Sequence, residues 1–188
     1  MNKLKKWHIL KSKMVINHRW CQVRQDEIEL PNGKIIADFF VVIRPEIALI
    51  LPITNHQEIV FVRQYRHGVS EILIELPAGS FDAAIEDAET AAVRELQEET
   101  GYVSQKVTKL ATLYDNPVKD TNKIHLFLAE NVIKIGEQKL DVTEDIEVIL
   151  IPVASVLDKI INGEICVAGT VAALFLGLNF LNQSRLQH

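Results

Sequence analysis

Cysteine is scarce in this chain of 188 residues, which contains only Cys21 and Cys166. The two lie far apart in the sequence and show no metal-ligand spacing, so the sequence argues against a disulfide framework and against a zinc site. Unpaired thiols suit a reducing compartment, and we expect a cytoplasmic protein. The lysines near the N-terminus are not followed by an apolar run, which a secretory signal would require.

The chain also lacks an apolar run long enough to cross a bilayer. Its longest apolar stretch, Val167 to Leu181, is shorter than the roughly 20 residues of a spanning helix, and Asn179 interrupts it. We therefore predict a buried C-terminal helix and no membrane association. A formal net charge of −5 argues against a nucleic-acid partner, because nucleic-acid-binding domains usually carry a basic face. The lysines near the start are expected to form a solvated N-terminal arm: Lys3, Lys5, Lys6, Lys11 and Lys13.

Strand-like runs dominate the first third of the chain, and helical patterns enter later. Asn32-Gly33 lies between two strand-like runs and predicts a hairpin, because both residue types tolerate positive φ. The predicted strands are Gln22–Leu30, Lys34–Ile43, Ile47–Ile53, Glu58–Gln64, Ile72–Leu76, Lys106–Tyr114, Ile124–Ala129 and Glu147–Pro152. The predicted helices are Asp87–Thr100, Val153–Ile161 and Thr170–Leu181.

This order of elements predicts an α/β protein with a mixed sheet covered by helices. Hydrophobic residues make up 48% of the chain, which is ample for a packed core. We expect a small N-terminal antiparallel sheet at residues 1–45, followed by a larger domain at residues 46–188. No internal repeat or low-complexity linker separates them.

The central predicted helix carries the most informative cluster of charges. Asp87 is suited to cap its start, and Gly101 stands where a helix-ending glycine belongs. Within it, Glu95, Glu98 and Glu99 are spaced i, i+3 and i+4 and so share one face. Like charges at this spacing repel, whereas Mg²⁺ binds carboxylate oxygens and would reverse the sign of the interaction. The spacing alone leaves two interpretations open, a metal platform and a solvated acidic face.

Two neighbouring features favour the metal platform. Arg94 lies one turn before Glu98 and can pair with it, which would hold that carboxylate in one rotamer. The run Leu76-Pro77-Ala78-Gly79 is expected to end a strand and start a loop, where glycine permits close backbone approach. The Ala78 carbonyl could then point at the same cation.

The stretch from Gly79 to Tyr102 resembles the Nudix box. Its matching part is Glu86-x7-Arg94-Glu95-Leu96-x-Glu98-Glu99-x-Gly101-Tyr102, which is in register with the family pattern. Six residues separate Gly79 from Glu86, one more than the family pattern has. The additional residue falls in a loop, where insertions are tolerated. It bears on the shape of the loop and leaves the helix unaffected.

The segments outside the box resemble the ADP-ribose pyrophosphatase branch of that family. They are Val62-Arg63-Gln64-Tyr65-Arg66-His67-Gly68, Glu75-Leu76-Pro77-Ala78-Gly79, Asn162-Gly163-Glu164-Ile165 and Thr170-Val171-Ala172-Ala173-Leu174. Pro117 stands at the distance beyond the box where the branch has a proline, although the chain has Asn-Pro-Val where the branch often has Ser-Pro-Gly. This resemblance implies an α/β/α sandwich and a homodimer in which the N-terminal sheet reaches the partner subunit.

The resemblance also implies hydrolysis of a nucleoside diphosphate linked to a further group. ADP-ribose would give AMP and ribose 5-phosphate, and GDP-mannose or another nucleotide sugar is the main rival substrate. Mg²⁺ is the expected metal, with Mn²⁺ as an alternative. A third reading, from a different class, is a non-catalytic ADP-ribose-binding sensor.

Site roles follow from the motif and from chemistry. The expected metal ligands are the Ala78 carbonyl, Glu95, Glu98 and Glu99, with Arg94 as an orienting partner of the carboxylates. Glu86 is expected to hold the helix start or to join the metal network.

A general base must also lie near the attacking water. In similar enzymes it comes from a late acidic loop, and we select Glu144, with Asp141 and Asp145 left open.

Three further side chains are candidates for substrate contacts besides Pro117. Arg63 and Arg66 lie on opposite faces of an alternating strand, so only one of them can face the site, and the resemblance favours Arg66. Trp20 could stack on a nucleobase, as could Trp7, although core packing is the commoner fate of tryptophan.

Overall fold

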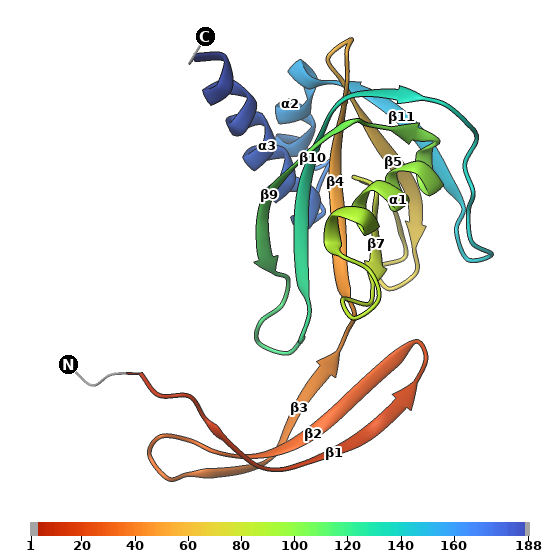
Figure 1. Ribbon diagram of the computed structural model, residues 1–188. Coiled ribbons are helices and arrows are strands. Elements are labelled where there is room, and N and C mark those ends of the chain that lie inside the picture. Colours follow the sequence, from red (N-terminus) through yellow and green to blue (C-terminus); the bar gives the residue numbers. More distant parts are fainter. Residues whose placement is uncertain (1–3, 187–188) are drawn as a thin grey trace. The chain divides into compact units, whose positions relative to one another are not determined.

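The computed structural model describes the backbone of residues 4–186 and the side chains of residues 4–183. The chain divides into two compact units. One unit comprises Met1–Pro45 together with Tyr114–Asn122, and the other comprises Glu46–Leu113 together with Lys123–His188. Figure 1 labels the elements of both units.

The first unit is built on a three-stranded antiparallel sheet in the order β1-β2-β3. Its strands are β1 (His8–His18), β2 (Cys21–Glu29) and β3 (Ile35–Ile43). The loop 114–122 joins this sheet, since the backbone N–H of Val42 donates to the carbonyl of Lys119 at 2.9 Å. Pro117 lies exposed in that loop.

The prediction of an N-terminal arm was wrong in part, because β1 occupies most of it. Lys11 and Lys13 lie in β1 opposite Glu27 and Gln25 of β2, whereas Lys5 and the adjoining Lys6 precede the strand. Lys3 lies outside the described residues. Every residue of β1 is exposed, so the strand has no buried face to impose the alternating pattern by which strands are recognised in a sequence.

The second unit contains an eight-stranded mixed sheet. The path β11-β5-β4-β10-β8 forms its body, with β6 beside β5, β7 beside β4 and β9 beside β10. β10 runs parallel to β4, while the other registered pairs are antiparallel. The strands are β4 (Glu46–Thr54), β5 (Glu58–Arg66), β6 (Glu71–Glu75), β7 (Ala78–Phe81), β8 (Tyr102–Val103), β9 (Lys106–Tyr114), β10 (Lys123–Lys134) and β11 (Ile146–Pro152).

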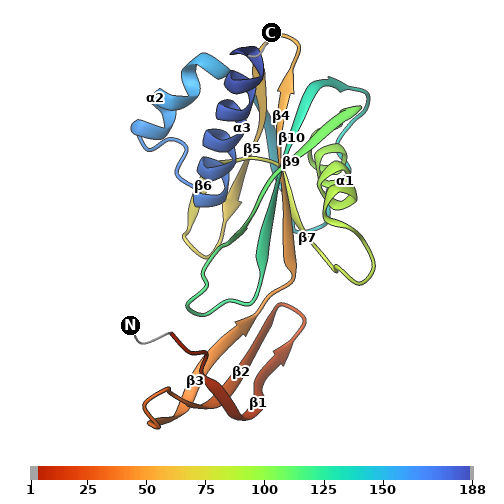
Figure 2. The same ribbon diagram turned by 60° about the vertical axis from the view of Figure 1, so that its left-hand side comes forward.

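Helices cover both faces of this sheet (Figures 1 and 2). α1 (Ala88–Thr100) packs on one face, where Ala48 and Ile50 of β4 point. α2 (Val156–Ile161) and α3 (Ala168–Leu186) pack on the other face, where Leu49 and Leu51 point, and a short 3-10 turn, η1 (Val153–Ser155), precedes α2. The predicted α/β/α sandwich with a mixed sheet and a small antiparallel sheet is therefore confirmed.

The last helix differs from the prediction in length and in burial. It extends from Ala168 to Leu186, whereas Thr170–Leu181 was predicted. Ala173 and Leu174 are fully buried, but Phe175 is 54% exposed. The helix therefore buries one face, as expected for a helix lying on a sheet, and is not buried on all sides. Among the described residues no helix is long and apolar enough to cross a membrane.

Strand β7 occupies residues that were expected to form a loop. Ala78 and Gly79 form an antiparallel ladder with Leu49 and Ala48 of β4. The segment is only four residues long, and its pairing with a distant strand is a tertiary contact that no local signal reveals. The predicted caps of α1 are confirmed, since Asp87 accepts hydrogen bonds from two backbone N–H groups of the first turn and Gly101 has φ of 74°.

Candidate active site

The three glutamates of α1 share one face but differ in burial. Glu95 and Glu99 are 8% and 3% exposed, whereas the side chain of Glu98 is 41% exposed. Two carboxylates one helical turn apart in the protein interior need a compensating positive charge or hydrogen bonds. The face is therefore not a simple solvated acidic surface.

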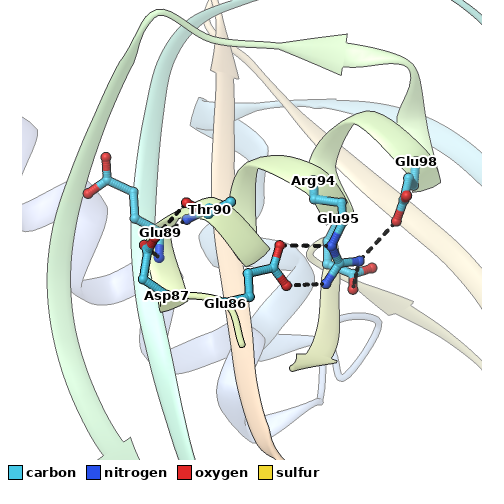
Figure 3. Close-up of polar contacts among 7 residues, drawn as sticks. All are labelled: Glu86, Asp87, Glu89, Thr90, Arg94, Glu95 and Glu98. Atoms are coloured by element: carbon cyan, nitrogen blue, oxygen red, sulfur yellow. Dashed lines mark hydrogen bonds and ion pairs between the residues drawn. The ribbon is translucent and has the colours of Figure 1, made fainter. Parts of the chain in front are cut away.

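Arg94 supplies part of that compensation (Figure 3). Its Nε and Nη2 donate to the two carboxylate oxygens of Glu86 at 3.1 and 3.0 Å. Its Nη1 donates to Glu95 at 2.7 Å and to Glu98 at 2.9 Å. The bonds to these carboxylates, that to Glu86 foremost, raise the pKa of Arg94 above its already high ordinary value. The predicted pairing with Glu98 is present, and the guanidinium fixes three carboxylates instead of one.

The backbone of β7 passes close to the two buried carboxylates. The N–H of Ala78 donates to Oε2 of Glu99 at 3.1 Å. A Cβ added at Gly79 would stand 2.0 Å from Oε1 of Glu95, a distance that no real Cβ tolerates. Glycine at this position therefore leaves the space that the Glu95 carboxylate occupies, and a larger residue would displace that carboxylate.

Burial shifts the titration of these carboxylates upward. It raises the pKa of Glu99 to about 8, and the negative charge of Glu95 adds to the effect. Burial also raises the pKa of Glu95, although Arg94 partly offsets this through its hydrogen bond. A proton or another cation is thus favoured at this pair, which is the electrostatic condition for a divalent metal ion.

The two arginines of β5 lie on opposite faces of the sheet. Arg66 shares the α1 face with Val60, and its Nε donates to the buried carboxylate of Glu75 at 2.7 Å. The positive charge of Arg66 lowers the pKa of Glu99 slightly, so the two side chains lie within electrostatic reach. Arg63 lies on the other face and pairs with Glu147 of β11.

Arg63 instead borders a hollow of about 620 Å³ on the face that α2 and α3 cover. Tyr65 and Ile72 are among its other lining residues. The structure therefore brings Arg66, and not Arg63, to the carboxylates.

The acidic segment before β11 places one acid near the glutamate pair. Glu144 is half-buried, whereas Asp141 and Asp145 are exposed. The negative charge of Glu144 contributes to the raised pKa of both Glu95 and Glu99. Of the three acids left open by the sequence, Glu144 is thus the one whose charge raises the pKa of Glu95 and Glu99.

The remaining predicted substrate contacts belong to the N-terminal unit. Trp20 is 68% exposed, with the guanidinium of Arg19 4.9 Å above its ring. Trp7 is half-exposed and meets Phe39 edge to face. The expectation that core packing is the commoner fate was wrong for both tryptophans, because the described residues of this unit contain no helix that could bury them against the sheet. Pro117 lies in the same unit, in the loop 114–122.

The donor set suits a hard cation, although it is not assembled around one point. Carboxylate and carbonyl oxygens from Glu95, Glu98, Glu99 and Ala78 are the ligand type that Mg²⁺ prefers. In the described part of the chain, no group of three or more His, Cys, Asp or Glu side chains is arranged to hold a metal ion. Arg94 engages Glu95 and Glu98, so a cation would compete with the guanidinium for them.

Two polar residues near the site escaped the sequence analysis. Glu75 anchors Arg66, and the side-chain amide of Gln138 donates to the backbone carbonyl of Glu99. Glu75 stood in a recognised motif without an assigned role. Gln138 lies in a polar loop with no motif around it, and only the folded structure brings it to the helix.

Comparison with known proteins identifies both units. Residues 7–42 match the N-terminal domain of nucleoside diphosphate sugar hydrolases, and residues 44–165 match the NUDIX domain. A solved structure described as an ADP compounds hydrolase superposes with a TM-score of 0.87 at 26% identity and covers 98% of both chains.

Three relatives cover most of the sequence. An ADP-ribose pyrophosphatase from Bacillus subtilis (strain 168) is 33% identical over 150 residues, which are 79% of this chain and 80% of the relative. A methanol dehydrogenase activator from Bacillus methanolicus is 31% identical over 175 residues, 93% of this chain and 94% of the relative. A GDP-mannose pyrophosphatase from Escherichia coli O9:H4 (strain HS) is 35% identical over 144 residues, 71% of each chain.

Proposed function

This chain belongs to the Nudix family of hydrolases, and we propose that it cleaves ADP-ribose to AMP and ribose 5-phosphate in a reaction that depends on Mg²⁺. The observation that carries the proposal is the pair of buried carboxylates, Glu95 and Glu99, held against the backbone of Ala78 and Gly79. Family members use divalent metal ions, and a non-catalytic sensor would have no need for this arrangement. The relatives named as ADP-ribose pyrophosphatases support the substrate.

The metal ligands we propose are Glu95, Glu98, Glu99 and the Ala78 carbonyl. A bound divalent ion neutralises the charge of the pyrophosphate and lowers the pKa of a bound water. The raised pKa of Glu99 supports its role, because a buried carboxylate with little compensation gains most from a nearby cation. Mn²⁺ offers the same preference for oxygen ligands and is the alternative.

Glu144 is our proposed general base. Its position near Glu95 and Glu99 would allow its carboxylate to accept the proton of the attacking water, provided that the water lies within hydrogen-bond reach. Arg94 acts as a positioning residue, since its guanidinium donates four hydrogen bonds to the carboxylates of Glu86, Glu95 and Glu98.

Arg66 is the proposed phosphate contact. Glu75 accepts a hydrogen bond from the Nε of Arg66, and the Arg66 side chain remains 46% exposed on the α1 face. The planar guanidinium suits a phosphate group. Arg63, on the other face and paired with Glu147, is not retained as a substrate contact in this proposal.

A homodimer would bring the N-terminal unit into use. Large apolar side chains are exposed on the three-stranded sheet and on its first turn, among them Ile9, Met14, Ile16 and Trp20. Exposed apolar surface of this extent is typical of an interaction surface. We propose that it packs against a second subunit and that Trp20 and Pro117 contribute to substrate binding there. The exposed free thiols of Cys21 and Cys166 would suit the cytoplasm, which is our proposed location.

Sedimentation velocity tests the dimer directly. We expect the wild-type protein to sediment with twice the 21.3 kDa mass of one chain. The Ile16→Asp variant should shift the equilibrium toward the monomer, because a charge would replace an apolar contact. Ile133→Asp, at an exposed isoleucine of β10 in the other unit, is the matched control and should remain dimeric. A wild-type monomer at micromolar concentration would contradict the proposal.

A substrate panel tests the reaction. With Mg²⁺, we expect kcat/KM for ADP-ribose to exceed that for GDP-mannose by at least about tenfold, a difference of about 1.4 kcal/mol in transition-state binding. Chelation of the metal should abolish both activities. Oxygen-18 water would show which phosphorus is attacked, through the product that carries the label. A preference for GDP-mannose, which one relative's name suggests, would contradict the substrate while leaving the chemistry intact.

A further inference from the structure

The segment between β10 and β11 carries Glu144 and is fastened to the end of α1. From Ile135 to Asp145 the chain forms no helix or strand. Its start is held by the N–H of Ile135, which donates to the carbonyl of Gly101 at 3.0 Å. The N–H of Lys139 donates to the carbonyl of Glu98 at 2.8 Å. This irregular segment is therefore anchored on the helix whose glutamates form the site.

Close packing supports the same anchor. A Cβ added at Gly101 would stand 2.1 Å from the carbonyl oxygen of Gly136. The segment thus passes directly against the C-terminal cap of α1, where only glycine leaves room and where its φ of 74° also favours glycine.

The side chain of Gln138 links this segment to the end of α1 and to the start of β11. The amide nitrogen of Gln138 donates to the carbonyl of Glu99 at 2.7 Å and to the carbonyl of Ile146 at 3.0 Å. An amide group has two donor hydrogens, so both are in use. Glu99 lies in the last turn of α1, where carbonyls have no partner within the helix. Ile146 is the first residue of β11, directly after the acidic segment.

Gln138 therefore closes a loop of residues 138–146 that contains Glu144, and it fixes that loop to Glu99, whose pKa the negative charge of Glu144 raises. Within the loop, Glu144 is held by a turn, in which the N–H of Asp141 donates to Oε2 of Glu144 at 2.9 Å. Closing a short flexible segment at its base removes much of its conformational freedom.

We propose that Gln138 is a positioning residue, which sets the place of Glu144 relative to Glu95 and Glu99 by joining the end of α1 to the start of β11. Its amide faces two backbone carbonyls and none of the site carboxylates, so it acts through Glu144 and is not a catalytic residue. This inference rests on the proposed function, in which Glu144 is the general base.

A double-mutant cycle tests the inference. Gln138→Met keeps the length of the side chain and removes both donors. We expect kcat for ADP-ribose with Mg²⁺ to fall at least tenfold, with KM changed less than twofold. In a Glu144→Gln background the same substitution should lower kcat less than twofold further, because residues that act as one unit are not additive. Gln105→Met, at an exposed glutamine in another loop, is the control and should keep kcat unchanged.

Hydrogen exchange of the metal-free protein gives a readout that is independent of activity. Gln138→Met should speed amide exchange in residues 139–145 at least tenfold, while the amides of α1 keep their protection. Full wild-type kcat, equal losses in both backgrounds, or unchanged exchange in residues 139–145 would each overturn the inference. Full activity of Glu144→Gln alone would instead overturn the base assignment, so the two failures are distinguishable.

Discussion

Glu99→Gln is expected to lower kcat/KM with Mg²⁺ by at least about 100-fold and, at the same time, to stabilise the metal-free protein at pH 8. Loss of a partner that only orients a metal ligand typically costs 10- to 100-fold, so the loss of a ligand itself should cost no less. The gain in stability comes from the burial of Glu99, which is 3% exposed. An uncharged amide avoids the free-energy cost of burying a charge.

The sign of the pH dependence follows from the direction of the shift. The pKa of Glu99 is about 8 in the folded protein, against an ordinary value of 4.5. Between these values the folded state binds a proton that the unfolded state has lost, so the free energy of unfolding falls as pH rises. The contribution is fully present below about pH 4.5 and is lost by about pH 8, an effect on the order of a few kcal/mol.

Urea denaturation at several pH values, with and without Mg²⁺, measures this pH dependence of the free energy of unfolding. The metal-free wild type should lose stability between pH 5 and 8. The Glu99→Gln variant should lose less stability over this pH range. Added Mg²⁺ should restore the stability of the wild type but not raise that of the variant. Glu89→Gln, at an exposed glutamate of the same helix, is the matched control and should change neither activity nor the pH slope. A Glu99→Gln variant with wild-type kcat/KM would remove Glu99 from the metal site.

Gly79→Ala is expected to lower kcat/KM by about 100-fold with little effect on folding. The new Cβ would stand 2.0 Å from Oε1 and 2.1 Å from Cδ of Glu95. Because these atoms are the end of a flexible side chain, the carboxylate can swing away at small cost to the fold. The displaced group is a proposed metal ligand, and a misplacement of about 1 Å in a catalytic site can cost about 100-fold.

The control is Gly68→Ala, in the turn between β5 and β6. A Cβ at Gly68 meets nothing within 4 Å, so activity and stability should remain those of the wild type. Isothermal titration with Mn²⁺ should show weaker binding to Gly79→Ala than to Gly68→Ala. A Gly79→Ala protein that is unfolded by circular dichroism, or that binds metal as the wild type does, would contradict the explanation.

Local sequence signals were sufficient where an element is fixed by its own residues. α1 was predicted with both caps because Asp87 and Gly101 act on the neighbouring backbone. Strand β7 and strand β1 were missed for a shared reason. Each depends on pairing with another strand, and neither has a strictly alternating apolar face that would show in its own residues.

The site shows the same division. The i, i+3, i+4 spacing placed Glu95, Glu98 and Glu99 on one helical face, and the alternation of β5 required that Arg63 and Arg66 separate. The sequence could not show that Glu98 is exposed while Glu95 and Glu99 are buried, because burial depends on how α1 lies on the sheet.

By itself, then, the sequence determined a helix with three carboxylates on one face, because spacing along a helix is a local geometric property. The Nudix family followed from the resemblance of the motif that this helix carries. The tertiary structure decided which carboxylates lose their water, that Arg94 holds three of them, and that Gln138 anchors the segment of Glu144 to α1. Burial and contacts between distant segments arise only when the chain has folded, and they set the charge balance on which a metal site depends.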